Sequence, residues 1–437
     1  MLEIWAGARI SAAVLAGWLV GPPASNAPPV GLTPATTTEQ SQVLSRPTPV
    51  DGVWVQAGLR TRPSAITGLV GIEPHQILTP AAFARALSRL QDLPVALDAR
   101  LNLRPTGTGA VSVDAFVAER AVLPVQPPAL VTIIGRVLFL DELRADIAGP
   151  LRAGDLWMAS WRWADGRPRV AMALSLPAPG WLPGVATFEA SRETQSYDPT
   201  PEVGGVSLVR ETRRRVGLSF SDWATSWARW HAGVAADRLL DTSFVALDAG
   251  IGLHAAHDRL AVAVSGGYWT PRAGGLSLRA GSISFGGRTT RLPTVSFWSV
   301  GATVSATNAA SPIALWPGAG SGKGRPLFLR AHPLVDDIGV TVGPLLGQRV
   351  AQATVEYEHP VQRSSAGTLS VAGFVDSARA WRRLSGLGTS PLFIDAGIGL
   401  RVHSPGLGGA IRIDIAHGVR GGGHTTLSAG WALAWLR

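Results

Sequence analysis

The stretch GAIRIDIAHG, residues 409–418, decides the fold class of this chain. Its three isoleucines occupy every second position, and Arg412 and Asp414 lie between them. Because successive side chains of a strand point to opposite faces, the isoleucines share one face and the charged residues share the other. A soluble β-sandwich would bury such isoleucines in a core. A membrane barrel would expose them to lipid and turn the charges toward a watery lumen.

The same alternation recurs in short segments through most of the chain after residue 129. Apolar side chains two positions apart surround Trp161, Val262, Val300 and Ile398, and Gly and Pro separate the segments. This pattern predicts strand after strand, with no long amphipathic helix among them.

The polar faces of these segments distinguish a barrel from a sandwich. They consist repeatedly of Gly, Asp and Arg, as with Asp248, Gly250 and Gly252 in one segment and Asp395 in another. A sandwich pools its apolar faces into one core, and these strands are too many for that. We count about 16 strand candidates, an even number as in bacterial barrels. The chain is therefore predicted to be mainly β, with residues 129–437 forming a transmembrane antiparallel β-barrel whose isoleucines face lipid.

The composition is consistent with such a barrel. The 437 residues are 46% hydrophobic with a mean hydropathy of +0.20, yet no apolar run after the N-terminus is long enough for a membrane-spanning helix. The chain has 16 Trp, a residue that favours the membrane interface, and no Cys. Its net charge of +9 comes from arginines scattered along the strands, which argues against a nucleic-acid-binding stripe.

The N-terminal residues read as an export signal followed by a linker. Arg9 precedes an apolar stretch that ends in small residues, so residues 1–27 are predicted to be a signal peptide. Residues 28–50 are rich in Pro, Thr and Ser and have no hydrophobic period, which is typical of a linker.

Residues 51–123 are predicted to form one small α+β domain. A strand at 53–60 is followed by a helix at 63–71 and by a second helix that begins with Thr79 as N-cap and Pro80 in its first turn. Two alternating strands follow, which gives the order β-α-α-β-β. This unit resembles a POTRA domain in its topology and in its amino-acid sequence.

The longest interruption of the strand pattern is residues 309–347, which we call the lid loop. It contains RPLFLRAHPLVDDIG and resembles the lid loop of the BamA/TamA-like outer-membrane family, the bacterial surface antigen domain. In that family an Arg-Gly-aromatic motif folds back into the barrel lumen. The matching lid motif here is Leu329, Arg330, Ala331 and His332, in which Ala331 and His332 replace the usual glycine and aromatic residue.

The resemblance also implies a latch for the lid loop. In the family, an aspartate at the place of Asp376 in VAGFVDSARAW lies in the lumen and pairs with the lid arginine, here Arg330. A guanidinium and a carboxylate can bond bidentately, which would hold the loop inside the barrel. The alternative is that the two charges are solvated and do not touch.

The last segment, SAGWALAW, resembles the β-signal by which barrel precursors are recognised. Ser428, Gly430, Leu433 and Trp435 have its polar-x-Gly-x-x-apolar-x-aromatic spacing. An ordinary amphipathic strand would show the same alternation.

The resemblance implies a function in assembling proteins into the bacterial outer membrane or translocating them across it. The POTRA domain would lie in the periplasm and bind extended clients, the barrel would contact outer-membrane lipids, and accessory periplasmic proteins are possible partners. A passive channel or structural barrel is the alternative, and an enzyme anchored by a barrel is a third. The sequence contains no Gly-x-Ser-x-Gly or His-Glu-x-x-His motif, so we expect no catalytic, metal or cofactor-binding residues.

Overall fold

The structure is a computed structural model that describes residues 48–433 of the chain. The gaps lie at residues 58–59, 108, 124–129, 131–132, 135, 138–140, 180–181, 183, 199–207, 257–258, 291, 321–328, 337–338, 342–344, 365–366, 383–388 and 404–408. The predicted signal peptide, most of the predicted linker and Trp435 lie outside the described residues.

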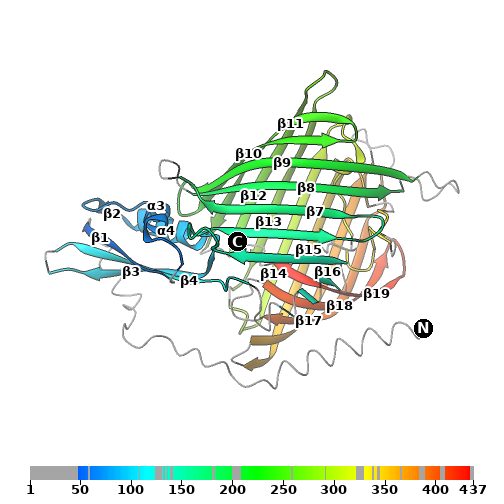
Figure 1. Cartoon of the computed structure of the whole chain (residues 1–437). Coiled ribbons are helices and arrows are strands. Elements are labelled where there is room, and N and C mark those ends of the chain that lie inside the picture. The colour runs from blue at the N-terminus through cyan, green and yellow to red at the C-terminus, as the bar shows by residue number, and fades with distance from the viewer. Residues whose placement is uncertain are drawn as a thin grey trace.

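The N-terminal domain is a four-stranded sheet covered on one face by two helices (Figure 1). The sheet order is β2-β1-β4-β3, and β1 pairs with β4 in parallel. The elements in chain order are β1 (Thr48–Ala57), α3 (Pro63–Val70), β2 (Ile77–Leu78), α4 (Pro80–Gln91), β3 (Ala96–Pro105) and β4 (Val111–Glu119). The domain begins slightly before residue 51, and β2 adds a strand between the two helices. The predicted order β-α-α-β-β missed β2 because two residues give no alternation to detect.

Local sequence signals mark the start of α4 and the end of α3. Thr79 caps α4 by accepting a hydrogen bond from the Ala82 backbone N–H at 3.2 Å, and Pro80 takes the first helical position, where no N–H is needed. Gly71 ends α3 with φ of 64°, a left-handed conformation that favours glycine. The buried faces of both helices, including Phe83 and Leu90, pack onto the sheet to form the core of the domain.

The rest of the chain forms one antiparallel sheet of fifteen strands in which every strand pairs with its neighbours in sequence, and the sheet curls into a barrel (Figure 1). The strands are β5 (Glu142–Ala148), β6 (Leu156–Arg162), β7 (Arg169–Pro177), β8 (Val185–Tyr197), β9 (Val209–Trp223), β10 (Ala228–Leu239), β11 (Thr242–Ala255), β12 (Leu260–Pro271), β13 (Leu278–Arg288), β14 (Phe297–Thr307), β15 (Arg349–Ser364), β16 (Gly367–Trp381), β17 (Phe393–His403), β18 (Gly409–Arg420) and β19 (Thr425–Leu433). A short 3-10 helix, η1 (Ile313–Leu315), lies between β14 and β15. The described part of the chain thus has one barrel strand fewer than the roughly sixteen expected. Among the described residues, no backbone pairing joins β5 to β19.

The strands alternate between the outside of the barrel and its interior as the sequence predicts. In β18, Ile415 is 52% exposed on the outside, whereas Asp414 is 0% and Arg412 8% exposed inside. In β16, Val375 is exposed while its neighbour Asp376 is buried. The opening stretch therefore turns its isoleucines outward and its charges into the lumen. No helix of the described residues is both long and apolar enough to span a bilayer.

The N-terminal domain is docked on one end of the barrel (Figure 1). Ala148, the last residue of β5, belongs to the core of the domain, and the Arg62 N–H donates to the carbonyl of Arg152 in the β5–β6 turn at 3.0 Å. Arg89 of α4 forms a buried bidentate pair with Asp222 of β9 at 2.7 and 2.5 Å. Since consecutive barrel strands run in opposite directions, the loop between β14 and β15 leaves the barrel at the opposite end.

Candidate functional site

Four of the buried carboxylates on the C-terminal strands form a group in the lumen. Glu356 of β15, Asp376 of β16, Asp395 of β17 and Asp414 of β18 all occupy inward positions, and each is less than 10% exposed. Carboxylates buried in this way need positive partners, because an unpaired buried charge is costly.

The lid motif supplies one of these partners. It lies between β14 and β15, yet it is buried inside the barrel. Its members are exposed as follows: Leu329 0%, Arg330 3%, Ala331 0% and His332 8%. A loop segment this deeply buried must satisfy its polar groups from the surrounding wall.

Arg330 contacts three of the wall carboxylates. Its Nη2 donates a hydrogen bond to Glu356 Oε2 at 2.7 Å, and its Nε lies 3.1 Å from Asp376 Oδ2. Nη1 lies 3.6 Å from Asp414 Oδ1. The guanidinium carbon also stacks on Phe374, 3.5 Å from the ring centroid. One lid side chain thus contacts three strands of the same wall, β15, β16 and β18.

The structure brings Arg330 and Asp376 together in a geometry that differs from the expected bidentate pair. The contact runs through one nitrogen and one oxygen, and it forms an ion pair without the alignment of a hydrogen bond. Thr354 occupies the other carboxylate oxygen by donating to Asp376 Oδ1 at 2.6 Å. The aligned hydrogen bond of Arg330 goes instead to Glu356.

A wall arginine completes this cluster. Arg401 of β17 binds Glu356 bidentately, at 2.8 Å through both nitrogens, and donates from Nη1 to Asp414 Oδ1 at 2.7 Å. Arg412 lies 3.6 Å from the second oxygen of Asp414. Three guanidinium groups therefore face three carboxylates, so that the cluster is electrically neutral although it is buried. We call Arg330, Glu356, Asp376, Arg401, Arg412 and Asp414 the lumen cluster.

Ala331 and His332 bind the fourth carboxylate. The Ala331 backbone N–H donates to Asp395 Oδ2 at 2.6 Å, and His332 Nδ1 lies 2.5 Å from Asp395 Oδ1. The imidazole packs edge-on against Phe393 with ring centroids 4.7 Å apart. His332 thus makes an aromatic contact at the aromatic position of the motif and adds a polar bond to it.

The lid loop is also anchored on the opposite wall. The side chains of Gln195 on β8 and Thr341 in the loop are hydrogen-bonded, and the Thr341 N–H donates to the carbonyl of Ser196 at 2.8 Å. Glu211 of β9 accepts from the Ala314 N–H at 2.6 Å. The loop also forms an apolar cluster with Tyr197 of β8 and with strands β15 to β17 of the C-terminal wall. Its buried members are Tyr197, Ala319, Leu329, Leu334, Leu345, Leu346, Val350, Ala378, Ala380 and Phe393. The described parts of the loop therefore bridge the lumen from wall to wall.

Sequence reasoning identified Arg330 and Asp376 as site residues but did not select the other charged residues that bind the lid motif or complete the lumen cluster. Glu356, Asp395, Arg401 and Asp414 each occupy an inward position of an alternating strand, and this is the signal that could have selected them.

Three residues of the proposed β-signal, Ser428, Gly430 and Leu433, lie in β19. In the strand register they are opposite residues of β18, in the pairs Asp414↔Ser428, Arg412↔Gly430 and Gly409↔Leu433. Among the described residues, no group of three His, Asp or Glu side chains is arranged to hold a metal ion.

Comparison with known proteins shows a likeness in structure alone. No protein-family model and no curated protein matches the sequence. CdiB from Escherichia coli superposes with a TM-score of 0.57 at 11% identity, over 94% of this chain and 92% of that one. BamA from Haemophilus ducreyi lacking POTRA domains 1–3 gives 0.52 at 12% identity, over 88% and 83% of the two chains. CdiB from Acinetobacter baumannii gives 0.53 at 11% identity, over 88% and 72%. The resemblance to BamA-like proteins predicted from the sequence is thus confirmed in structure: this chain has the fold of BamA and CdiB.

Proposed function

We propose that this protein is an outer-membrane barrel that inserts client polypeptides into the membrane or translocates them across it. The N-terminal domain acts as a POTRA domain in the periplasm, and the lid loop gates the barrel. The observation that carries the proposal is Arg330, which holds a loop from the far end of the barrel against three strands of the C-terminal wall.

The outer surface of the barrel supports a membrane location. Large apolar side chains on many strands are exposed on the outside, where a soluble protein would present polar groups. They include Val170, Phe188, Val216, Val234, Leu247, Ile251, Ile283, Val304, Val375, Ile398 and Ile415. Lipid would cover this surface.

The N-terminal domain offers an edge for an extended client. Among the described residues, β3 (Ala96–Pro105) is the last strand of its sheet and pairs with β4 alone. A client strand could add to this edge and satisfy its backbone groups by hydrogen bonding, which is β-augmentation. The domain is docked at the end of the barrel opposite to the lid loop, so that a captured client lies beside the barrel entrance.

The gating part of the proposal follows from the chemistry of the lumen cluster. At the C-terminal wall, the lid motif is held by one guanidinium and by one backbone N–H with its neighbouring imidazole, rather than by covalent bonds. Such a contact is strong while water is excluded and weakens once water enters, because the local dielectric rises. The lid can therefore have two states.

The test is the conductance of the purified full chain in planar bilayers, for the wild type beside Arg330→Ala and Asp376→Ala. Folding is checked by the heat-modifiable mobility of the barrel on gels. We expect a mostly closed wild type and two variants that open, with the larger effect in Arg330→Ala because it loses contacts to three carboxylates.

The matched control is Arg213→Ala. Arg213 also lies in the lumen with a buried carboxylate partner, Asp237 at 2.5 Å, but it touches the N-terminal wall and not the lid motif. This variant should stay closed. If all four proteins conduct steadily and alike, the lid is not a gate, and a passive channel becomes the better description.

Client capture needs a separate measurement. A photocrosslinker placed at exposed Arg100 on β3 should trap extended outer-membrane precursors, whereas one at exposed Ala81 on α4 should not. Equal crosslinking at both positions would contradict capture by β-augmentation.

A further inference from the structure

Three arginines form a row on the outer face of the barrel near the end that carries the lid loop. Arg192 of β8, Arg214 of β9 and Arg238 of β10 are all exposed and face outward. In the strand register Arg192 lies directly opposite Arg214, and Arg214 lies directly opposite Arg238. We call these three residues the rim triad.

The register makes this row unfavourable without a partner. Neighbouring strands are about 4.8 Å apart, so the three side chains leave the sheet within about 10 Å. Like charges that face each other across strands destabilise a sheet. Among the described residues, no carboxylate pairs with Arg192 or Arg214, and Arg238 has only a 3.3 Å contact with the fully exposed Asp241. The triad therefore has an excess of positive charge and free donors.

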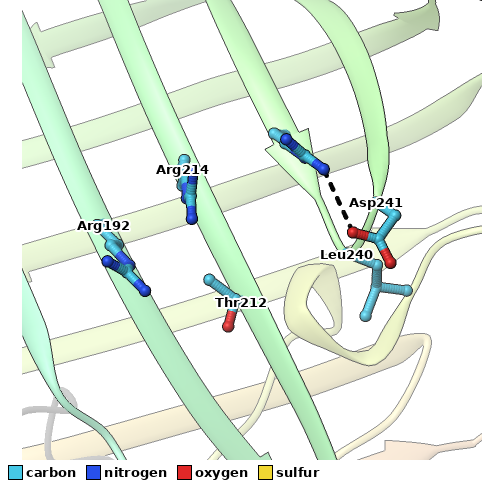
Figure 2. Close-up of a pocket in the computed structure, with 6 residues that line it drawn as sticks. Arg192, Thr212, Arg214, Leu240 and Asp241 are labelled. Atoms are coloured by element: carbon cyan, nitrogen blue, oxygen red, sulfur yellow. Dashed lines mark hydrogen bonds and ion pairs between the residues drawn. The ribbon is translucent and has the colours of Figure 1, made fainter.

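The triad also lines a surface pocket (Figure 2). The pocket has a volume of about 170 Å³ and is formed by Arg192, Thr212, Arg214, Arg238, Leu240 and Asp241. Figure 2 shows Arg192 and Arg214 on neighbouring strands, with Leu240 and Asp241 of the β10–β11 turn beside them. Leu240 adds an exposed apolar side chain to the polar donors.

The neighbouring rows place the triad at the border of the apolar surface. The next outward row toward the N-terminal domain is Ala190, Val216 and Ala236, and the one after it is Phe188, Leu218 and Val234. On the other side of the triad, Thr194 and Thr212 face each other. The outer surface thus changes from apolar to cationic within one row, as expected where a hydrocarbon layer meets its head groups.

We propose that the rim triad binds the phosphate groups of lipopolysaccharide, the lipid of the outer leaflet. This inference rests on the proposed function, because it takes the N-terminal domain to lie in the periplasm and the opposite end of the barrel to face outward. Arginine suits the task, since its planar fork of donors matches phosphate oxygens. The acyl chains of the lipid lie along the rows of Val216 and Val234, on the side of the triad toward the N-terminal domain. A free phosphate ion would make no use of this apolar surface.

The experiment measures binding of lipid A, the phosphorylated anchor of lipopolysaccharide, to the full chain in detergent micelles. Native mass spectrometry counts the lipids retained. We compare the wild type with Arg214→Gln and with Arg192→Gln/Arg214→Gln/Arg238→Gln. We expect a loss of affinity of roughly tenfold for the single substitution, because one charge-assisted contact is lost, and no measurable retention for the triple variant.

Arg279→Gln is the matched control. Arg279 faces outward at the same end of the barrel, but it stacks on Tyr268 and has no arginine opposite it. It should retain lipid A almost as the wild type does. Because every substitution lies on the outer surface, the heat-modifiable mobility should be unchanged, which excludes misfolding as the cause.

Two further arms separate the possible ligands. Dephosphorylated lipid A should not be retained, and millimolar inorganic phosphate should compete only weakly. The inference is overturned if the triple variant retains lipid A as well as the wild type, or if inorganic phosphate displaces it completely. Binding in micelles does not depend on lid gating, so this failure is distinct from a failure of the conductance test.

Discussion

The N-terminal and C-terminal walls of the barrel both contain arginine–carboxylate ion pairs in the lumen, but the pairs connect different parts of the molecule. In the N-terminal wall, lumen charges pair between strands: Arg213 with Asp237, Arg215 with Glu189 and Asp248, and Arg162 with Glu193. In the C-terminal wall, the carboxylates of β15 to β18 are shared between wall arginines and the lid motif. A pair within a wall separates only when strands separate. A pair with the lid separates when one loop moves, so the same chemistry supports a fixed wall on one side and a movable contact on the other.

Among the substitutions that test this difference between the walls, Glu356→Gln is expected to have the largest effect. Glu356 accepts hydrogen bonds from both Arg330 and Arg401, so that its loss leaves two buried guanidinium groups short of an anion, at a cost of about 3–5 kcal/mol. The conductance at rest should rise to the level of Arg330→Ala. The matched variant Asp237→Asn should lower the temperature of the gel-mobility shift without opening the channel. Opening in both variants would mean that the two walls do not differ in function.

Asp222→Asn probes the N-terminal wall as the support of the domain. Asp222 is the buried bidentate partner of Arg89, and removing its charge should weaken docking by about 3 kcal/mol. Spin labels on α4 and on the β11–β12 side of the barrel should report a wider distance distribution. The closed conductance should remain, because the lid motif is held by Glu356, Asp376, Asp395 and Asp414 on other strands. An unchanged distance distribution would show that the apolar core around Ala148 is enough to dock the domain.

Asp395→Asn tests whether the carboxylate of Asp395 or the ring contact between His332 and Phe393 holds this end of the lid motif. It weakens the acceptor for the Ala331 N–H and for His332, and charged hydrogen bonds of this kind contribute about 1.5–3 kcal/mol. The open fraction in bilayer recordings should rise by about ten- to hundredfold. His332→Phe keeps the ring contact with Phe393 and should have a smaller effect. The reverse ranking would show that ring packing, not the carboxylate, holds this end of the lid motif.

The smallest effect concerns the pH dependence of docking. Burial raises the pKa of Asp92 at the end of α4 above its ordinary value of 3.8, although Arg229 and the Trp223 N–H act in the opposite direction. Because the docked state binds the proton more tightly, the contribution of Asp92 is fully present below pH 3.8 and is lost as the pH rises through the raised pKa. The same spin-label distances should narrow between pH about 7 and about 4 in the wild type, and less in Asp92→Asn. An equal response in both would assign the effect to another group.

Much of this architecture could be predicted from local patterns in the sequence. Alternation gave the inward and outward faces of β16, β17 and β18, and Thr79 with Pro80 marked the start of α4. The proximity of Arg330 and Asp376 was inferred from a family resemblance, and the structure places their atoms 3.1 Å apart. Whether this contact acts as a latch stays a prediction.

What the sequence did not indicate depends on register between distant segments. The arginines of the rim triad are more than twenty residues apart in the chain, so they read as scattered charges until strand pairing aligns them. Glu356 and Arg401 are likewise brought together across two intervening pairings. Alternation tells which face a side chain occupies. It does not tell which side chain lies beside it, and that neighbour decides whether a charge is solvated, paired or shared.

The unbroken alternation of strand direction has a consequence for the two edges of the large sheet. Each strand from β5 to β19 runs opposite to the one before it, so the first and the last of the fifteen point the same way. If these edges met directly, they could form only a parallel ladder, whose bonds are slanted and slightly weaker. One additional strand between them, from this chain or from another, would be antiparallel to both. An odd number of additional strands between β5 and β19 would therefore close the described sheet with antiparallel pairing throughout. A hairpin adds two strands, so one of the new pairings would be parallel.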